Sequence, residues 1–122
     1  FEASSGVDDG DIYIQRPLIL KGHELNSELR EKQARLTIAM CLEFLEGYEK
    51  YKIPYKQHGE ESFYLKRGVK DSELNVDKTI KEQFNLLRTV SNNEYPAFFV
   101  MNGHKYIVKI LQSTGDEKDK II

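Results

Sequence analysis

An Asn-Gly pair, Asn102-Gly103, constrains the fold of this chain more than any other feature of its sequence. A two-residue type I′ turn needs positive φ at both positions, which Asn and Gly tolerate best, so the pair is a strong hairpin signal. Residues 97–101 are apolar and residues 104–111 alternate, which predicts a hairpin over 96–112. The turn sets the register: Met101 faces His104, Phe99 faces Tyr106 and Ala97 faces Val108 on one side, while Val100 faces Lys105 and Phe98 faces Ile107 on the other.

A long helix is predicted from about Asn26 to Gly47. Asn26 or Ser27 can cap its first turn, and Gly47 can end it. Its second half, residues 36–45, is apolar nearly all round. A helix that is apolar on every side must be covered on every side, so we expect Cys41 to be a small buried residue there.

A second, shorter helix is predicted over about 77–91. Val76, Ile80, Phe84 and Leu87 recur there at helical spacing and form one apolar face. Serine and asparagine residues at 91–93 end it.

Two further segments have the pattern of strands. Residues 11–20 alternate around Ile12 and Ile14, although Pro17 lacks a ladder donor and either ends this strand or places it at a sheet edge. Residues 62–67 form the second predicted strand, and residues 51–56 can pair with it as a short edge strand.

These elements predict an α+β fold with an antiparallel or mixed sheet of four to five strands, packed by one long and one shorter helix. The order is β-α-(β)-β-α-β-β. If residues 51–56 pair with 62–67, the order resembles a ferredoxin-like unit with an extra C-terminal strand. Otherwise a looser α+β sandwich, or a cystatin-like wrap of a curved sheet around the long helix, fits the same elements.

The chain has 122 residues, a length that predicts one domain. Small, polar and acidic residues predict a flexible lead-in over 1–10, and mixed charges predict a flexible tail over 113–122. The folded domain is therefore expected over 11–112. Because the first residue is Phe1 rather than Met, we expect a processed chain or a piece of a longer protein.

Composition excludes several classes of protein. A net charge of -2 and a pI of about 6.0 argue against a dedicated polyanion binder. No apolar run approaches the roughly 18 residues of a membrane span, so no membrane insertion is expected. One cysteine excludes an internal disulfide and a cysteine-based zinc site, and fits the cytosol slightly better than an oxidising compartment.

The second face of the predicted hairpin is a candidate binding surface for a protein partner or a second copy of the chain. Apolar and basic residues alternate on it, as in an interface with a basic rim. Coverage by a helix or a neighbouring strand, with the lysine stems reaching outwards, is the alternative. The candidate residues are Phe98, Val100, Lys105, Ile107 and Lys109.

Residues 48–70 interleave aromatic and basic side chains and are a candidate nucleic-acid surface. The segment contains six basic and three acidic residues, a local excess charge of +3. Basic groups neutralise phosphates, and aromatic rings stack on bases. A solvated edge with packed tyrosines is the alternative reading. The candidate residues are Tyr51, Lys52, Tyr55, Lys56, Lys66 and Arg67.

No catalytic, cofactor or metal motif is present, and the three histidines do not have the spacing of ligands. Glu43 stands alone in an apolar segment, where burial would raise its pKa and make it a functional candidate; otherwise it reaches solvent. The sequence favours a small protein-protein interaction module that binds rather than catalyses. A nucleic-acid-binding accessory domain that uses residues 48–70 is the alternative, and a small hydrolase or nuclease with a dispersed site is the third.

Overall fold

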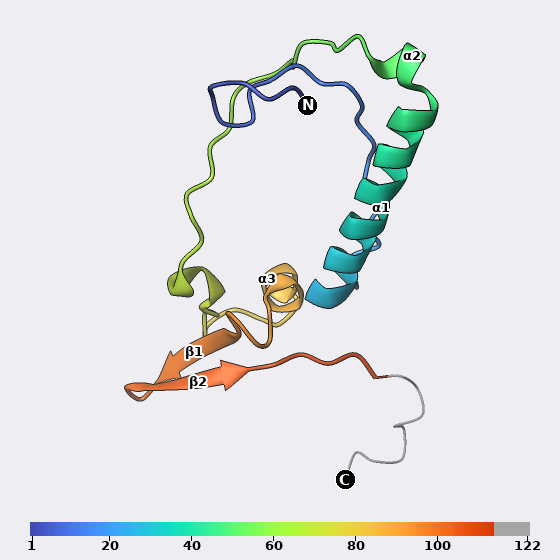
Figure 1. Cartoon of the computed structure of the whole chain (residues 1–122). Coiled ribbons are helices and arrows are strands. Elements are labelled where there is room, and N and C mark those ends of the chain that lie inside the picture. The colour runs from blue at the N-terminus through green and yellow to red at the C-terminus, as the bar shows by residue number, and fades with distance from the viewer. Residues whose placement is uncertain (114–122) are drawn as a thin grey trace. The chain divides into compact units, whose positions relative to one another are not determined.

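The computed structural model describes residues 1–113, so all but the first residue of the predicted tail lies outside the described part of the chain. The chain divides into two compact units. Unit 1 contains Phe1–Ile19 and Arg30–Leu65, and unit 2 contains Leu20–Leu29 and the chain from Lys66 onward. The elements are α1 (Asn26–Glu46), α2 (Tyr48–Tyr51), the 3-10 helix η1 (Val69–Ser72), α3 (Phe84–Thr89), β1 (Ala97–Met101) and β2 (His104–Val108) (Figure 1).

The hairpin and the long helix confirm the two predictions that rest on the clearest local signals. Asn102 and Gly103 have φ of 52° and 77°, as a type I′ turn requires. The β1–β2 ladder has the predicted register: Ala97↔Val108, Phe98↔Ile107, Phe99↔Tyr106, Val100↔Lys105 and Met101↔His104. Helix α1 begins at Asn26 and ends at Glu46, one residue before Gly47.

The fold is therefore mixed α and β with one long helix, but the predicted sheet of four to five strands is not seen. Within residues 1–113 the sheet has two strands, β1 and β2. Residues 11–20 contribute one isolated bridge, in which Ile12 and Tyr55 exchange backbone hydrogen bonds of 2.7 and 2.9 Å. The backbone of Tyr55 pairs with Ile12, and residues 51–56 do not pair with 62–67, so the ferredoxin-like order is not formed.

Residues 62–67 are irregular, so the strand predicted there is wrong. A strand is stable only when a neighbour accepts and donates its backbone hydrogen bonds, and no described residue pairs with this segment. Its apolar side chains are consequently exposed, with Phe63 at 83% and Tyr64 at 93%.

The second helix is shorter than the predicted 77–91, because side chains take the backbone groups of the segment before it. Gln83 accepts from the backbone N–H of Asn75 at 2.5 Å and donates to its carbonyl at 3.0 Å. Thr79 and Glu82 exchange hydrogen bonds of the capping-box kind, with N–H to side-chain distances of 2.8 and 3.2 Å. The bonds from the Gln83 side chain to the backbone of Asn75 compete with helical hydrogen bonds there, whereas the Thr79–Glu82 bonds close a turn. The helix α3 begins at Phe84.

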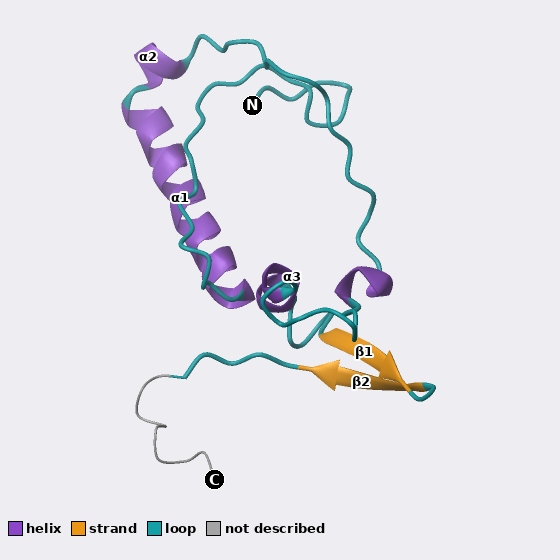
Figure 2. Cartoon of the chain, turned by 180° about the vertical axis from the view of Figure 1, so that it is seen from behind, coloured by secondary structure: helices purple, strands orange, loops and turns teal. Residues whose placement is uncertain are grey.

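The core of unit 2 lies where α3 meets the start of the hairpin (Figure 2). Leu87, Val90 and Ala97 are buried together, and the half-buried residues Leu74, Leu86, Val108 and Ile110 pack against them. A parallel bridge joins Glu73 to Phe98, and the N–H of Leu74 donates to the Phe98 carbonyl at 2.7 Å.

A buried ion pair joins the segment before α1 to α3. Glu24 is fully buried, and its carboxylate accepts from the backbone N–H groups of Lys21 and Gly22 at 2.7 and 2.8 Å. Arg88 donates to the Glu24 carbonyl at 3.0 Å and lies 3.9 Å from its carboxylate. Asn26 adds a third link, because its side chain donates to the Thr89 carbonyl at 2.9 Å.

In unit 1 the extended segment before α1 runs back along the helix (Figures 1 and 2). Tyr13 packs edge-on against Phe44, and Phe44 packs edge-on against Tyr48, with ring centroids 5.7 and 5.8 Å apart. Gln57 donates to the carbonyls of Asp8 and Gly10 at 2.8 and 2.7 Å.

The expected cover on every side of α1 is not found among the described residues, since none of its side chains is fully buried. Ile38, Leu42 and Leu45 are exposed. Cys41 is exposed as well, so the prediction that it is buried is wrong.

Replacing Arg88 with Met is expected to lower the free energy of unfolding by about 3 kcal/mol, the lower end of the range for breaking a buried ion pair. The loss leaves the buried Glu24 carboxylate without the opposite charge of Arg88. Arg35→Met is the control, because Arg35 is 78% exposed and its i,i+4 pair with Glu31 contributes at most about 0.5 kcal/mol. Urea denaturation measures both variants. Equal losses for the two would show that the Glu24–Arg88 pair does not organise unit 2.

Candidate functional site

The predicted nucleic-acid residues fall in both units, and each group is described by itself. Tyr51, Lys52, Tyr55 and Lys56 belong to unit 1, and Lys66 and Arg67 belong to unit 2.

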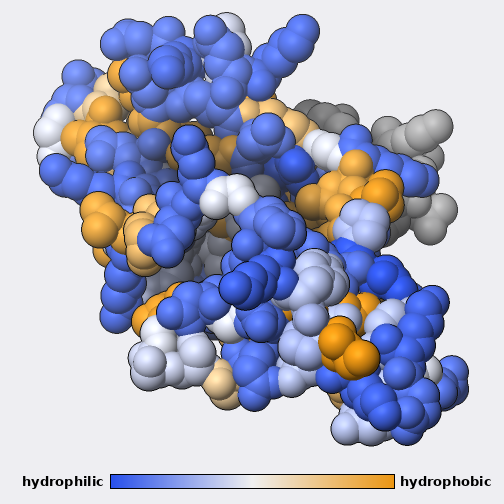
Figure 3. Space-filling view, turned by 90° about the horizontal axis from the view of Figure 1, so that it is seen from above, coloured by the Kyte–Doolittle hydropathy of each residue, from blue (hydrophilic) through white to orange (hydrophobic). Residues whose placement is uncertain are grey.

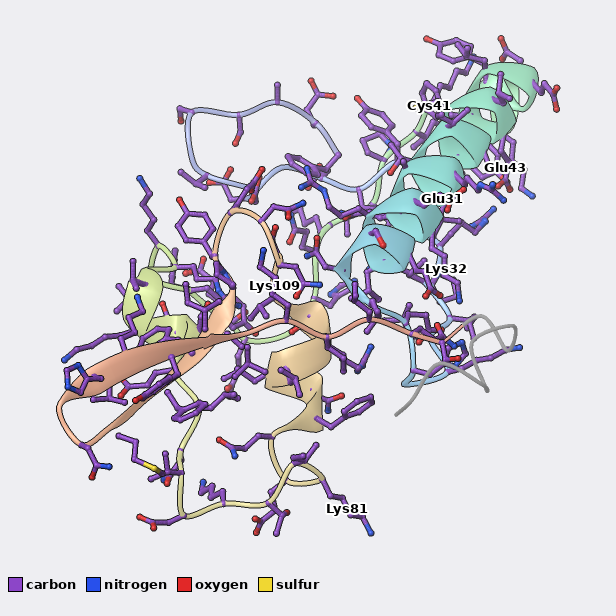
Figure 4. The ribbon with its side chains drawn as sticks, turned by 90° about the horizontal axis from the view of Figure 1, so that it is seen from below. Glu31, Lys32, Cys41, Glu43, Lys81 and Lys109 are labelled. Atoms are coloured by element: carbon purple, nitrogen blue, oxygen red, sulfur yellow. The ribbon has the colours of Figure 1, made fainter. Side chains whose placement is uncertain are left out.

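Tyr51 takes part in a polar cluster and is not a free stacking surface. Its hydroxyl donates to the Glu43 carboxylate at 2.8 Å and accepts from Arg16 at 3.0 Å. Arg16 also pairs with Glu43, and Lys50 lies 5.2 Å from the centre of the Tyr51 ring. Glu43 lies on α1 (Figure 4), half-exposed. The hydrogen bonds from Arg16 and then from Tyr51 lower the pKa of Glu43, the opposite of the shift that burial would give.

Lys52 forms an ion pair with Glu49 at 2.5 Å, which neutralises part of the local charge. Lys56 is exposed and makes no ion pair with any residue of the described chain. Tyr55 is held by its backbone in the bridge to Ile12 while its side chain stays exposed. Tyr55 and Lys56 are therefore the members of the unit 1 group that can receive an external ligand.

In unit 2, Lys66 is exposed, and Arg67 is anchored through one nitrogen. Nη2 of Arg67 donates to the Asp71 carbonyl at 3.2 Å and to the Ser72 hydroxyl at 3.3 Å. These contacts anchor one nitrogen of the guanidinium, and the residue is exposed. An anchored guanidinium loses less conformational entropy when it binds a phosphate.

The exposed aromatic residues between these basic groups add stacking surfaces. Phe63 and Tyr64 lie in the irregular segment 62–67. Apolar side chains at the surface are not restricted to this segment, because the face drawn in Figure 3 shows hydrophobic groups lying among hydrophilic ones. Exposed rings and lysines are the groups that single-stranded nucleic acids bind.

The candidate residues of the hairpin differ in their exposure to solvent more than predicted. Phe98 is only 6% exposed, and the ammonium of Lys105 lies 4.1 Å from the centre of its ring. Val100 and Ile107 are exposed, and Lys109 is exposed just beyond β2 (Figure 4). Burial here follows position along the strand, because the strand ends nearest α3 are covered and the turn is not.

Sequence patterns did not single out Ser72 and Tyr95. The hydroxyl of Ser72 is buried and donates to the Tyr95 carbonyl at 3.2 Å. The two residues are 23 positions apart, and no local signal connects them. Among residues 1–113, no three His, Cys, Asp or Glu residues are grouped to hold a metal ion, and no helix is long and apolar enough to cross a membrane.

Comparison with known proteins identifies similar chains. No family model matches the chain. Methionyl-tRNA formyltransferase of Mycoplasma mycoides subsp. mycoides is 26% identical over 105 residues, which cover 84% of this chain and 33% of that protein. The same enzyme of Mycoplasma capricolum subsp. capricolum is 24% identical over 105 residues, with the same coverage. The chain thus spans about a third of the length of these curated relatives.

A solved structure, methionyl-tRNA formyltransferase from Clostridium thermocellum, superposes on the chain with a TM-score of 0.70. The match covers 93% of this chain and 48% of that one at 21% sequence identity, so it shows a shared fold. These similarities contradict the interpretation of the chain as a protein-protein interaction module, because the proteins it resembles are tRNA-modifying enzymes. They agree better with the nucleic-acid alternative.

The Arg16–Glu43–Tyr51 cluster is expected to stabilise the chain only while Glu43 is ionised. Because folding lowers the pKa of Glu43, its contribution is complete above the ordinary glutamate pKa of about 4.3 and is lost as the pH falls through the lower folded value. Glu43→Gln should therefore be less stable than the wild type near neutral pH, and the difference should shrink in acid. Denaturation at a series of pH values measures it.

Glu46→Gln on the same helix is the matched control, since Glu46 forms no ion pair with the described residues. It should show no such pH-dependent difference. A Glu43→Gln difference that is constant from neutral to acidic pH would contradict the assignment.

Proposed function

We propose that the chain is an RNA-contacting portion of a formyltransferase that acts on methionyl-tRNA. The observation that carries the proposal is the match of 84% of the chain to two methionyl-tRNA formyltransferases. The shared fold with the Clostridium thermocellum enzyme supports it. The chain spans about a third of the curated relatives, and the function that we propose for it is binding of the tRNA.

The exposed basic and aromatic residues of 55–67 support this function. Lys56, Lys66 and Arg67 offer cations to phosphates, and Tyr55, Phe63 and Tyr64 offer exposed rings. The overall charge is -2, and residues 55–67 hold Glu60 and Glu61 beside their three cations, so attraction to RNA must come from individual contacts of lysine or arginine with phosphate. Each lysine that neutralises a phosphate releases a counterion, so binding of this kind weakens as salt rises.

A labelled methionine tRNA is expected to bind the chain with an affinity that falls steeply between low and moderate salt. The double variant Lys56→Gln, Lys66→Gln should bind more weakly and reduce the slope of log affinity against log salt by about 1 per lysine. Fluorescence anisotropy across a salt series measures both quantities.

Lys81→Gln is the matched control, because Lys81 is an exposed lysine in the loop before α3, outside residues 55–67 (Figure 4). It should leave the slope unchanged. Absence of tRNA binding, or a slope that Lys81→Gln reduces as much as the double variant does, would refute the proposed function.

A further inference from the structure

Unit 2 contains a surface hollow of about 230 Å³ that no part of the sequence pattern predicted. It lies where the end of η1, the turn before β1 and strand β2 meet. The residues that line it are Val69, Ser72, Glu94, Tyr95, Pro96, Lys105 and Ile107.

Hydrogen bonds fix the wall of this hollow. Ser72 is 1% exposed; its hydroxyl donates to the Tyr95 carbonyl and accepts from Arg67. The N–H of Gly68 donates to the carboxylate of Asp71 at 2.7 Å, which closes the first turn of η1. A ligand that enters the hollow therefore meets backbone that is already ordered, and a preformed site loses less free energy on binding.

Lys105 gives the hollow one group that can bind an anion. Lys105 lines it, and the contact of its ammonium with the Phe98 ring holds the side chain along the hairpin. Arg67 is not part of the lining, but it donates a hydrogen bond to the hydroxyl of Ser72, which is. Glu94 is the acidic residue of the lining, so the lining holds one cation and one carboxylate, and Lys105 is the group that can bind a phosphate.

The apolar part of the hollow suits a flat ring. Tyr95 is 52% exposed although its backbone is held by Ser72. Pro96 follows it, and the exposed side chains of Val69 and Ile107 complete the lining. An exposed tyrosine on a fixed backbone offers a stacking surface at small entropic cost.

We propose that this hollow binds one unpaired nucleotide of an RNA, with its base against Tyr95 and its phosphate at Lys105. The inference rests on the proposed function and goes beyond it, because it assigns a single-stranded element of the RNA to a definite site. Loss of one stacked base weakens binding by about tenfold or more, so the site contributes a measurable share of the affinity.

The test uses a labelled single-stranded hexa-adenylate and the full chain. Tyr95→Leu should weaken binding by about tenfold, in line with the loss of one stacked base, whereas Tyr95→Phe should retain it. Tyr106→Leu is the matched control, since Tyr106 is similarly exposed at 48% on the same hairpin but does not line the hollow.

Lys105→Gln should weaken binding and lower the salt slope by about 1, and it decides the question alone if Tyr95→Leu does not fold. The inference is overturned if tRNA binds but neither Tyr95→Leu nor Lys105→Gln weakens hexa-adenylate binding, or if Tyr106→Leu weakens it equally. If the unaltered chain binds no tRNA at all, the proposed function fails with it.

Discussion

Glu24 carries a carboxylate with no solvent-exposed surface, and unit 2 is arranged around the need to compensate that charge. Removing an ion from water costs several kcal/mol unless hydrogen bonds and an opposite charge replace the lost solvation. Two backbone N–H groups and Arg88 supply them. Arg88 lies on α3, a helix of six residues that is too short to be stable alone. The ion pair and the adjacent core residues Leu87 and Val90 therefore hold α3 in place.

Once α3 is held, the elements of unit 2 that form the hollow beside Tyr95 are fixed in turn. The core residues on α3 pack against Ala97 at the start of β1, and the Leu74–Phe98 hydrogen bond ties the chain after η1 to the same strand. Ser72 then joins η1 to Tyr95. The ends of the hairpin strands near α3 are buried by this arrangement, while the turn at Asn102-Gly103 stays in solvent. The hollow beside Tyr95 is thus a consequence of how the small core of unit 2 is anchored.

The sequence predicted those elements whose determinants are local. The Asn-Gly turn specifies the hairpin register without any distant residue, and a cap followed by helix formers specifies α1. Elements that need a partner were not predictable in the same way. The alternation in residues 11–20 and 62–67 is compatible with strands, but Tyr55 pairs with Ile12 and residues 62–67 have no described partner. The helix expected from 77 is shortened because Gln83 bonds to the backbone of Asn75.

The candidate site was predictable to a similar extent. Composition alone pointed to the basic and aromatic residues 48–70. In the structure Lys56 is exposed and available to a ligand, whereas the hydroxyl of Tyr51 is hydrogen-bonded to Glu43 and Arg16. The Ser72–Tyr95 contact and the Glu24–Arg88 pair join residues 23 and 64 positions apart, and no periodicity encodes such a distance. The preference for a protein-binding module rested on the half-helix that is apolar all round, the two-faced hairpin, the charged ends and the absence of catalytic motifs. Aromatic rings beside cations, which the hairpin also carries, occur on RNA-binding surfaces too.

Hydrogen–deuterium exchange of the chain with and without methionine tRNA tests the central claim, binding of RNA through these surfaces, most directly. The account predicts slower exchange on binding in residues 55–67 and around Tyr95 and Lys105. It predicts no change along α1 at residues 38–45, whose exposed side chains are apolar. Protection confined to α1, or no protection anywhere at saturating tRNA, would contradict it.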